Sequence, residues 1–439
     1  MIRKIRLEGY KSFADATLEA APLTVVFGPN DAGKSNLLDA FDLLSELVEV
    51  DSLKKAFDTA LHRGRLVEAF FSPKGFGEEG LRDLKRRGTL QLTLTVDFDL
   101  QDQVQERINT QLADREQIAQ TKVAYTRVVE TFLRYRISLR YDYASGEPFV
   151  ADENLIPLSG NGEPRVSRKP FIELDKDHQR FVARIERQGH PRYFDIHRNR
   201  TLLSEISDPV YHPHVVAAKE ELRSWRSYYV EPSLVRRESG VHGAEDPGRH
   251  GEDLAAFYWK LKHEHLDHFK VVSLNLARLI PSLRGIDIRE VRGTLDPVVL
   301  EASGGEFPFR LASEGTLRLL CLLGIAVAPN APSMVAYEEP ENGVQPGRID
   351  ILAGILEDIA ARGRTQVILT SHSPPFIERL RGAHLLRCFR NDIGRSSFED
   401  WAPADRMFVA QGVEEGSREP ASERHASRLS ERLLRGELQ

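Results

Sequence analysis

The chain has 439 residues, of which 41% are hydrophobic and 29% charged, as is typical of a globular protein with a sizeable core. The 60 Lys and Arg side chains against 66 Asp and Glu give a net charge of −6, which excludes a globally basic polymer binder. Two cysteines are too few for a disulfide scaffold or a four-cysteine zinc site. There is no signal-peptide-like start, and no apolar run approaches the ~20 residues that span a bilayer. We therefore expect a cytoplasmic protein with no membrane association.

The first elements predicted along the chain surround a glycine-rich loop. Apolar residues at Ile2, Ile5 and Leu7 predict a strand that ends in a turn. The apolar run 23–27 predicts a second strand that leads directly into the loop, and apolar residues spaced by three and four predict a helix over 37–47. A strand, a glycine loop and a helix in this order are what a phosphate-binding loop requires.

Two longer strands are predicted in the first half. Residues 90–100 and 133–143 alternate apolar and polar side chains, which predicts half-buried antiparallel strands with one face in water. Apolar residues spaced by four within 101–120 predict an amphipathic helix between them. From 144 to 250 the chain carries prolines at short intervals, so we expect irregular structure there and exclude a long coiled coil.

Helical and strand patterns alternate in the last third, which predicts a mainly parallel sheet. Together with the first half, this indicates the α/β class. The predicted helices cover 254–269, 272–280, 316–327, 348–362 and 375–381, and the predicted strands cover 286–291, 297–300, 333–337 and 365–370.

The glycine loop carries the strongest chemical signal, because it matches the P-loop pattern and has the right element on each side. Backbone N–H groups of such a loop converge on the β-phosphate, and the helix N-terminus adds partial positive charge. Lys34 is placed to reach the β- and γ-phosphates, and the Ser35 hydroxyl is placed for Mg²⁺. The residues expected to bind the nucleotide are Gly28, Pro29, Asn30, Asp31, Ala32, Gly33, Lys34, Ser35 and Asn36.

Two adjacent carboxylates, Glu338 and Glu339, follow the predicted strand 333–337. The first can hold the Mg²⁺ shell, while the second can polarise an attacking water. Such a pair alone is more often solvated surface, but a P-loop in the same chain favours the functional interpretation. His372 follows the strand 365–370, where a side chain faces the crevice in which parallel sheets bind ligands. A lone histidine is usually structural, but this position favours a catalytic role.

Ser313 and Gly315 stand at the start of the apolar helix 316–327. A serine and a glycine at a helix N-terminus can bind phosphate through backbone N–H groups, as a P-loop does. A second phosphate cap for the same nucleotide would be redundant within one chain. We therefore predict that it serves the nucleotide of a partner chain, which implies a homodimer or a higher homo-oligomer.

Three other clusters fit structural roles better than functional ones. Basic and aromatic residues interleave over 223–229 and could stack on nucleic acid, but a partly buried segment is the favoured interpretation. Three arginines of the strand 133–143 are interpreted as a solvated face rather than phosphate ligands. Three histidines of 263–268 lie on one predicted helix, where the lack of further ligands nearby disfavours a metal site.

The order of the motifs resembles that of the ABC-type ATPases of the SMC/RecF group, in which two heads sandwich two ATP molecules between the P-loop of one and the signature loop of the other. More narrowly, it is similar to the OLD-like (overcoming lysogenization defect) ATPases of the AAA family. The resemblance is specific over 1–45 and 300–380 and general elsewhere. Its motifs are Gly9-Tyr10-Lys11-Ser12-Phe13, the loop 28–36, Ser313-Glu314-Gly315-Thr316-Leu317-Arg318 and Glu338-Glu339-Pro340-Glu341-Asn342-Gly343.

The resemblance implies roles for the residues of the nucleotide site. Lys34 and Ser35 would bind the phosphates and Mg²⁺ of a bound ATP, and Glu338 takes the place of the usual Walker B aspartate. Glu339 would be the general base, and His372 would be the switch histidine.

The resemblance also assigns the partner-facing residues and shows departures from the pattern. Ser313 and Gly315 would act in trans on the γ-phosphate, and the loop 342–346 would cross between subunits. The signature reads Ser-Glu-Gly rather than Ser-Gly-Gly, Glu338 replaces aspartate, and Gln345 stands where histidine is common.

The expected architecture is an ABC-type P-loop ATPase head with an antiparallel β lobe, a mainly parallel core sheet and an irregular α/β insertion. Residues 1–100 would form the N-terminal part of the head, and 101–270 an insertion or lid region that includes the strand 133–143. Residues 271–400 would form the C-terminal part, followed by a charged tail over 401–439. The long insertion disfavours a transporter ATPase, and too few residues follow the last core helix for a TOPRIM nuclease domain.

The function expected from these observations is enzymatic: Mg²⁺-dependent ATP hydrolysis at composite sites in a head-to-head dimer. It would be coupled to DNA or to a separate effector, such as a nuclease, in phage defence or DNA maintenance. Two alternatives stay open, a nucleotide-gated binding module with negligible turnover and a RecF-like DNA repair protein. Glu339, a candidate general base, favours ATP hydrolysis over a binding module with negligible turnover. The segment 338–342 resembles the OLD-like ATPases more than the RecF-like repair proteins.

Overall fold

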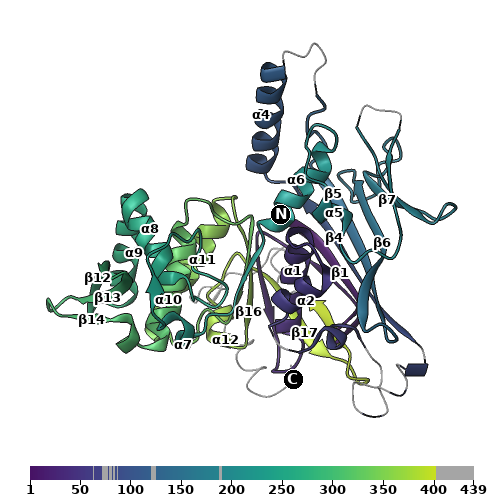
Figure 1. Cartoon of the computed structure of the whole chain (residues 1–439). Helices are drawn as coiled ribbons and strands as arrows, with labels where there is room; N and C mark the ends of the chain where they lie inside the picture. The colour runs from purple at the N-terminus through teal and green to yellow at the C-terminus, as the bar shows by residue number, and fades with distance from the viewer. Residues whose placement is uncertain are drawn as a thin grey trace, which may run out of the picture. The chain divides into compact units, whose positions relative to one another are not determined.

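The computed structural model describes residues 1–62, 64–71, 78, 82, 85–86, 88–119, 125–186 and 190–401 (Figure 1). The chain forms two compact units, each assembled from separated segments. The first comprises Met1–Ala21, Ser35–Trp225 and Cys388–Phe398, and the second comprises Pro22–Lys34, Arg226–Arg387 and the described residues from Glu399 on. The functional division at 100, 270 and 400 stays a prediction, and the tail beyond residue 401 lies outside the described residues.

The strands of the first unit form one sheet. They are β1 (Ile2–Tyr10), β2 (Phe13–Glu19), β4 (Thr89–Asp99), β5 (Phe132–Asp142), β6 (Glu147–Pro157), β7 (Ile172–Asp175), β8 (Arg180–Ala183) and β9 (Arg192–Phe194). The eight strands follow the order β2-β1-β4-β5-β6-β7-β8-β9, and every neighbouring pair is antiparallel. The alternation that predicted β4 and β5 is confirmed, because their apolar side chains are buried.

The segment 144–250 holds more regular structure than its prolines predict, since β6 to β9 continue the sheet. The prolines stand where a missing N–H costs little. Pro157 ends β6, while Pro213 and Pro232 each begin a helix.

The helices of the first unit include the predicted amphipathic one. They are α1 (Lys34–Glu49), α2 (Leu53–Ala60), α4 (Asp102–Ala119), α5 (Leu202–Glu205) and α6 (Pro213–Arg223). Helix α4 packs against α6 and buries Val104, Ile108 and Leu112, the apolar residues spaced by four (Figure 1). Among the described residues, no helix is both long and apolar enough to cross a bilayer.

The second unit contains the parallel sheet predicted from the last third. The strands of this sheet are β3 (Leu23–Phe27), β10 (Arg226–Tyr228), β15 (Met334–Glu338), β16 (Gln366–Ser371), β17 (His384–Arg390) and β18 (Ser396–Asp400). Cys388–Arg390 of β17 and Ser396–Phe398 of β18 are counted with the first unit. The order is β10-β15-β16-β3-β17-β18, and the pairs from β10 to β17 are parallel. A small antiparallel sheet consists of β11 (Ser239–Gly240), β12 (Leu283–Val291), β13 (Thr294–Glu301) and β14 (Glu306–Pro308).

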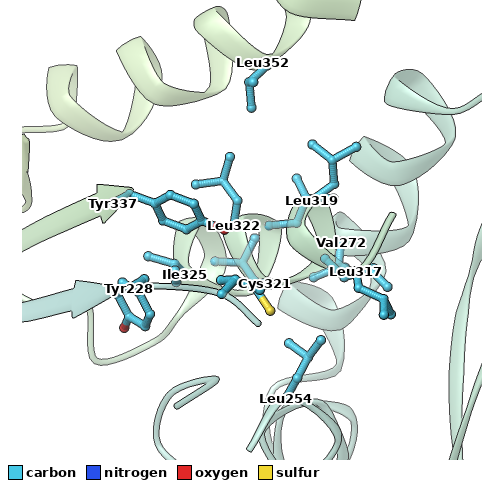
Figure 2. Packing of buried hydrophobic residues seen from close by; sticks show 14 of the residues in the cluster. Tyr228, Leu254, Val272, Leu317, Leu319, Cys321, Leu322, Ile325, Tyr337 and Leu352 are labelled. Carbon is cyan, nitrogen blue, oxygen red and sulfur yellow. The ribbon is translucent and has the colours of Figure 1, made fainter. Parts of the chain in front are cut away.

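Helix α10 is the centre of the core of this unit. The helices are α7 (Pro232–Val235), α8 (Leu254–Glu264), α9 (Leu266–Leu279), α10 (Glu314–Val327), α11 (Ile349–Ala361) and α12 (Pro374–Ile377). Figure 2 shows side chains of α10 among Tyr228 and Tyr337 from the sheet and Leu254, Val272 and Leu352 from α8, α9 and α11. A helix that is apolar all round must be enclosed by its neighbours. The core therefore fixes the helix that carries the predicted signature loop.

A buried carboxyl connects β6 to α5 in the first unit. Glu153 is fully buried and accepts hydrogen bonds from the N–H groups of Leu202 at 2.7 Å and Leu203 at 3.0 Å. The Tyr135 hydroxyl donates a third bond at 3.1 Å. Burial nevertheless raises the pKa of Glu153 from 4.5 to about 7, because desolvation disfavours the charged form more than these bonds favour it.

This raised pKa predicts how stability depends on pH. The unfolded chain ionises Glu153 near pH 4.5, whereas the folded chain holds the proton to about pH 7. The contribution of Glu153 to stability is therefore fully present below pH 4.5 and is lost as the pH rises towards 7. We expect scanning calorimetry to show a smaller fall in melting temperature from about pH 5 to about pH 7.5 in Glu153→Gln than in the wild type. The exposed Glu147→Gln control on the same strand should keep the wild-type slope, and equal slopes in all three proteins would contradict the prediction.

Candidate functional site

The candidate site lies at the carboxyl edge of the parallel sheet in the second unit. Strand β16 is flanked by β15 and β3, and the register pairs Glu338 with Thr370 and Ser371 with Phe27. Because neighbouring strands are roughly 4.8 Å apart, the three segments that follow begin at one level of the same edge. These segments are the glycine loop after β3, the acidic loop after β15 and the histidine turn after β16.

The glycine loop is folded around the side chain of Lys34. The lysine is only 7% exposed, and its ammonium donates to the carbonyls of Gly28 at 2.8 Å and Pro29 at 2.9 Å. The backbone is left-handed at Asp31 (φ 66°) and Gly33 (φ 111°). Such changes of hand turn successive N–H groups towards one side, which is the arrangement that binds anions. The structure thus gives the predicted residues the shape of a P-loop.

The last two predicted residues of this loop belong to the first unit. Ser35 is exposed near the start of α1. Asn36 has its side-chain amide directed at the Ser12 hydroxyl, to which it donates at 2.9 Å. The Asn36 amide therefore holds the first turn of α1 to the turn after β1, whose Gly9–Phe13 sequence belongs to the recognised motif.

Glu339 and His372 form the polar centre of the acidic loop and the histidine turn. His372 Nδ1 lies 2.7 Å from Glu339 Oε1, and the amide of Asn342 donates to Glu339 Oε2 at 2.6 Å. The Glu339 N–H donates to the Thr370 carbonyl at 3.0 Å, with the Glu339 backbone held left-handed at φ 48°. Bonds at both carboxylate oxygens fix the orientation of this side chain. Glu338, half-buried, is the last residue of β15.

Ser313 is the N-cap of α10. Its hydroxyl accepts the N–H of Thr316 at 3.2 Å, as expected for a serine at this position. Ser313 is exposed, whereas Gly315 is buried. Among the described residues, no hydrogen bond joins Ser313 or Gly315 to the glycine loop, Glu339 or His372.

Gly315 instead lies directly against the loop that follows β15. A Cβ added at Gly315 would lie 2.0 Å from the carbonyl oxygen of Gly343. A Cβ at Gly343, whose φ is +83°, would lie 2.7 Å from Gly315 Cα. Neither position can carry a side chain without a backbone shift, so the start of α10 packs backbone to backbone on the acidic loop.

Two residues of the site were missed by the sequence interpretation. Glu341 is only 6% exposed, and its carboxylate accepts a hydrogen bond from the Ser371 hydroxyl. Burial is the largest cause of the raised pKa of Glu341. The sequence features that could have pointed to these two residues were a third carboxylate in the 338–343 motif and a serine directly before His372. Nothing local in the sequence showed that the two side chains meet.

The basic and aromatic cluster over 223–229 is structural. Trp225, in the first unit, packs edge-on against Phe41 and Phe98. Tyr228, in the second unit, stacks on Tyr337. These rings are buried, so they do not offer faces for base stacking. The interpretation as a buried segment is confirmed.

The other two clusters also have structural partners. The arginines of β5 are bound by polar side chains: Arg134 by Asp97, Arg136 by Asp152 and Arg140 by Gln91. The arginines on the polar face of β5 are thus bound to neighbouring side chains and are not simply solvated. The histidines do not share a helix, because α8 ends and α9 begins at His265. His263 and His268 each place Nδ1 on a backbone carbonyl, and no described group of metal-ligating side chains includes the three.

The fold and the site together define an α/β nucleotide-binding head of the P-loop class. Residues 1–143 match the family model described as "AAA ATPase domain". Residues 244–378 match the model described as "AAA domain, putative AbiEii toxin, Type IV TA system". The two matched ranges contain the glycine loop, the signature helix, the acidic loop and His372. The segments that form the candidate site are therefore similar in sequence to ATPase domains.

Solved structures identify the fold more closely. The structure of an Smc head bound to the C-winged helix domain of ScpA is 13% identical, with 93% of this chain and 99% of that chain covered at a TM-score of 0.50. A second similar structure is the Smc head domain with an extended coiled coil bound to the C-terminal domain of ScpA, derived from Pyrococcus furiosus. It is 11% identical, and the match covers 93% of this chain and 98% of that chain at a TM-score of 0.50. The fold is thus that of an SMC ATPase head. A search of the curated proteins gives no match.

The contact between Gly315 and Gly343 yields a stability prediction. Because the added methyl group would overlap the Gly343 carbonyl, Gly315→Ala should destabilise the protein by about 2 kcal/mol or more. Gly354→Ala is the matched control, because this glycine also lies in a helix but nothing lies within 4 Å of the place that its methyl group would take. The control should gain about 0.5–1 kcal/mol from better helix propensity. Thermal unfolding measures both changes, and a stable Gly315→Ala protein would show that the two backbones are not in contact.

Proposed function

We propose that this chain is a Mg²⁺-dependent ATP hydrolase whose sites are composite, each made of the P-loop of one chain and the Ser313 cap of another. The observation that carries the proposal is the convergence of the P-loop, Glu339 and His372 on one edge of three adjacent parallel strands. The match of both site-forming segments to ATPase-domain models supports it. Within the SMC-like fold, the 338–343 motif favours an OLD-like protein.

The residues of the site suit in-line attack of water on the γ-phosphate. Lys34 would exchange the carbonyls of Gly28 and Pro29 for β- and γ-phosphate oxygens. Glu339 would take a proton from water as the water oxygen bonds to the γ-phosphorus and the bond to the β,γ-bridging oxygen breaks, leaving ADP and phosphate. With Nδ1 directed at Glu339, His372 has Nε2 available for the γ-phosphate.

The oxygen donors of the site suit Mg²⁺. The Ser35 hydroxyl and the Glu338 carboxylate would hold the ion, since Mg²⁺ prefers oxygen ligands and binds through few protein groups. The half-buried carboxylate at the end of β15 is the kind of donor such a site requires. When bound, Mg²⁺ neutralises charge that develops on the phosphates.

The cycle of ATP binding and hydrolysis would act on a second molecule. The two SMC heads of the same fold were each solved with a domain of ScpA bound. By analogy, we propose that the ATP-bound homodimer of this cytoplasmic protein controls a separate effector, such as a nuclease, or engages DNA. Phage defence and DNA maintenance are the processes that fit such an assembly.

The first test is the mass in solution of Glu339→Gln with and without ATP and Mg²⁺. Removing the general base should slow turnover at least about a hundredfold while leaving nucleotide binding intact. We expect a monomer without nucleotide and a dimer with ATP, measured by light scattering. Lys34→Ala, which removes the phosphate-binding ammonium, is the control and should stay monomeric.

Other outcomes of this test are informative. A dimer under all conditions would mean that ATP reshapes an existing assembly. A monomer under all conditions, with ATP bound, would reject the composite site. Intact dimerisation with no measurable turnover in the wild type would favour the nucleotide-gated binding module.

A mixing experiment tests the trans role of Ser313. Lys34→Ala and Ser313→Arg should each be inactive alone, because one lacks phosphate binding and the other has a blocked cap. In a mixed dimer one of the two sites receives an intact P-loop and an intact cap. An equal mixture should therefore recover up to about half of wild-type ATP turnover, because each mixed dimer has one intact site of two. Continued inactivity despite mixed dimers would place the Ser313 cap outside the ATP site.

A further inference from the structure

Glu341 connects the acidic loop to the histidine turn. It lies two residues after Glu339, and its carboxylate accepts a hydrogen bond from the hydroxyl of Ser371, the last residue of β16. The Ser371 oxygen in turn accepts the N–H of Ser373 at 3.0 Å. The chain of bonds thus runs from Glu341 through Ser371 to the far side of His372. It closes the turn that carries the histidine.

The side chain of His372 depends on this turn for its position. The imidazole is 48% exposed, and Glu339 at 2.7 Å is its hydrogen-bonded partner among the described residues. An exposed side chain with one such bond is placed mainly by its backbone. The distance from His372 to Glu339 therefore depends on the Ser371–Ser373 turn, and the turn is tied to Glu341.

Glu341 is an unfavourable residue for this place if stability alone is considered. Its side chain is buried, and its Oε2 atom has no hydrogen-bond partner within the described part of the chain. A buried carboxyl with an unsatisfied oxygen costs stability, and an apolar side chain of similar size often costs less. Locally unfavourable groups of this kind are typical of functional sites, where the surrounding structure supports them.

We propose that Glu341 is a positioning residue for ATP hydrolysis, which holds the Ser371–Ser373 turn so that His372 meets Glu339. This inference rests on the proposed function. Glu341 itself contacts neither the nucleotide nor water in the reaction, and acts through Ser371. Loss of its bond lets the turn move while the P-loop, which binds the nucleotide, keeps its structure.

The test compares Glu341→Leu with Glu341→Gln. Leucine removes the acceptor, whereas the glutamine Oε1 can still accept from Ser371. We expect Glu341→Leu to lower kcat about ten- to a hundredfold, since small misplacements of catalytic groups have effects of this size, with KM for ATP changed less than about twofold. Glu341→Gln should recover most of kcat. The melting temperature of Glu341→Leu should equal or exceed that of the wild type.

Two further measurements separate positioning from general structure. Ser371→Ala should reproduce the kcat of Glu341→Leu, and the double variant should be no slower than either single variant, because both act on one bond. Amide exchange, followed by mass spectrometry, should speed up about tenfold in peptides covering 371–376 of Glu341→Leu and stay unchanged elsewhere in the second unit.

Each alternative result overturns a distinct statement. An unchanged kcat in Glu341→Leu, or a raised KM together with a lowered melting temperature, would reject the positioning role. A wild-type protein that binds but does not hydrolyse ATP would reject the proposed function instead. In that case the exchange of 371–376 still decides whether Glu341 holds the turn.

Discussion

Hydrogen bonds between β15, β16 and β3 decide where the residues of the candidate site meet. The three strands come from opposite ends of the chain, yet their register brings Glu338 level with Thr370 and Ser371 level with Phe27. Strand β16 is buried along its whole length and is paired on both sides. A slip of one residue would turn every side chain of β16 to the opposite face and carry the histidine turn with it. The site therefore needs the complete sheet.

Stability and function are divided between neighbouring parts of the second unit. The acidic loop combines a left-handed glutamate, a buried carboxyl and a glycine with positive φ. The left-handed glutamate and the buried carboxyl cost free energy, whereas the glycine adopts its positive φ without strain. They are packed beside α10, whose side chains are largely buried and provide apolar stabilisation. The Gly315–Gly343 contact joins the two parts, so the well-packed helix supports the strained loop.

The sequence was informative wherever function or burial leaves a local pattern. The P-loop, the alternation of β4 and β5, and the βα alternation of the last third all depend on residues close together in the chain. The strands β7 to β9 were not predicted, because they are short and are defined by their partners rather than by their own periodicity. The prolines suggested irregular structure, yet several of them occupy the ends of elements. The break between α8 and α9 at His265 was not predicted either, because no proline or glycine marks it in the sequence.

The site was predictable in its residue types but not in its internal bonds. Glu339 and His372 were identified from their places after buried strands, and the structure brings them to 2.7 Å. The bond between Glu341 and Ser371 joins the acidic loop to the last residue of β16, and α11 lies between these two residues in the chain. A contact of that kind depends on strand register and loop shape together, which no single sequence segment encodes.

The pairing of β3 has a consequence for the protein's synthesis on the ribosome. This apolar strand emerges long before its partners β16 and β17, which lie hundreds of residues further along the chain. At about 5–20 residues per second, β3 waits on the order of tens of seconds before it can be covered. The antiparallel sheet of the first unit can form meanwhile, whereas the nucleotide-binding sheet must assemble last. Nascent chains should thus rely on chaperones to shield the exposed Leu23–Phe27 segment from aggregation until β16 and β17 have been synthesised.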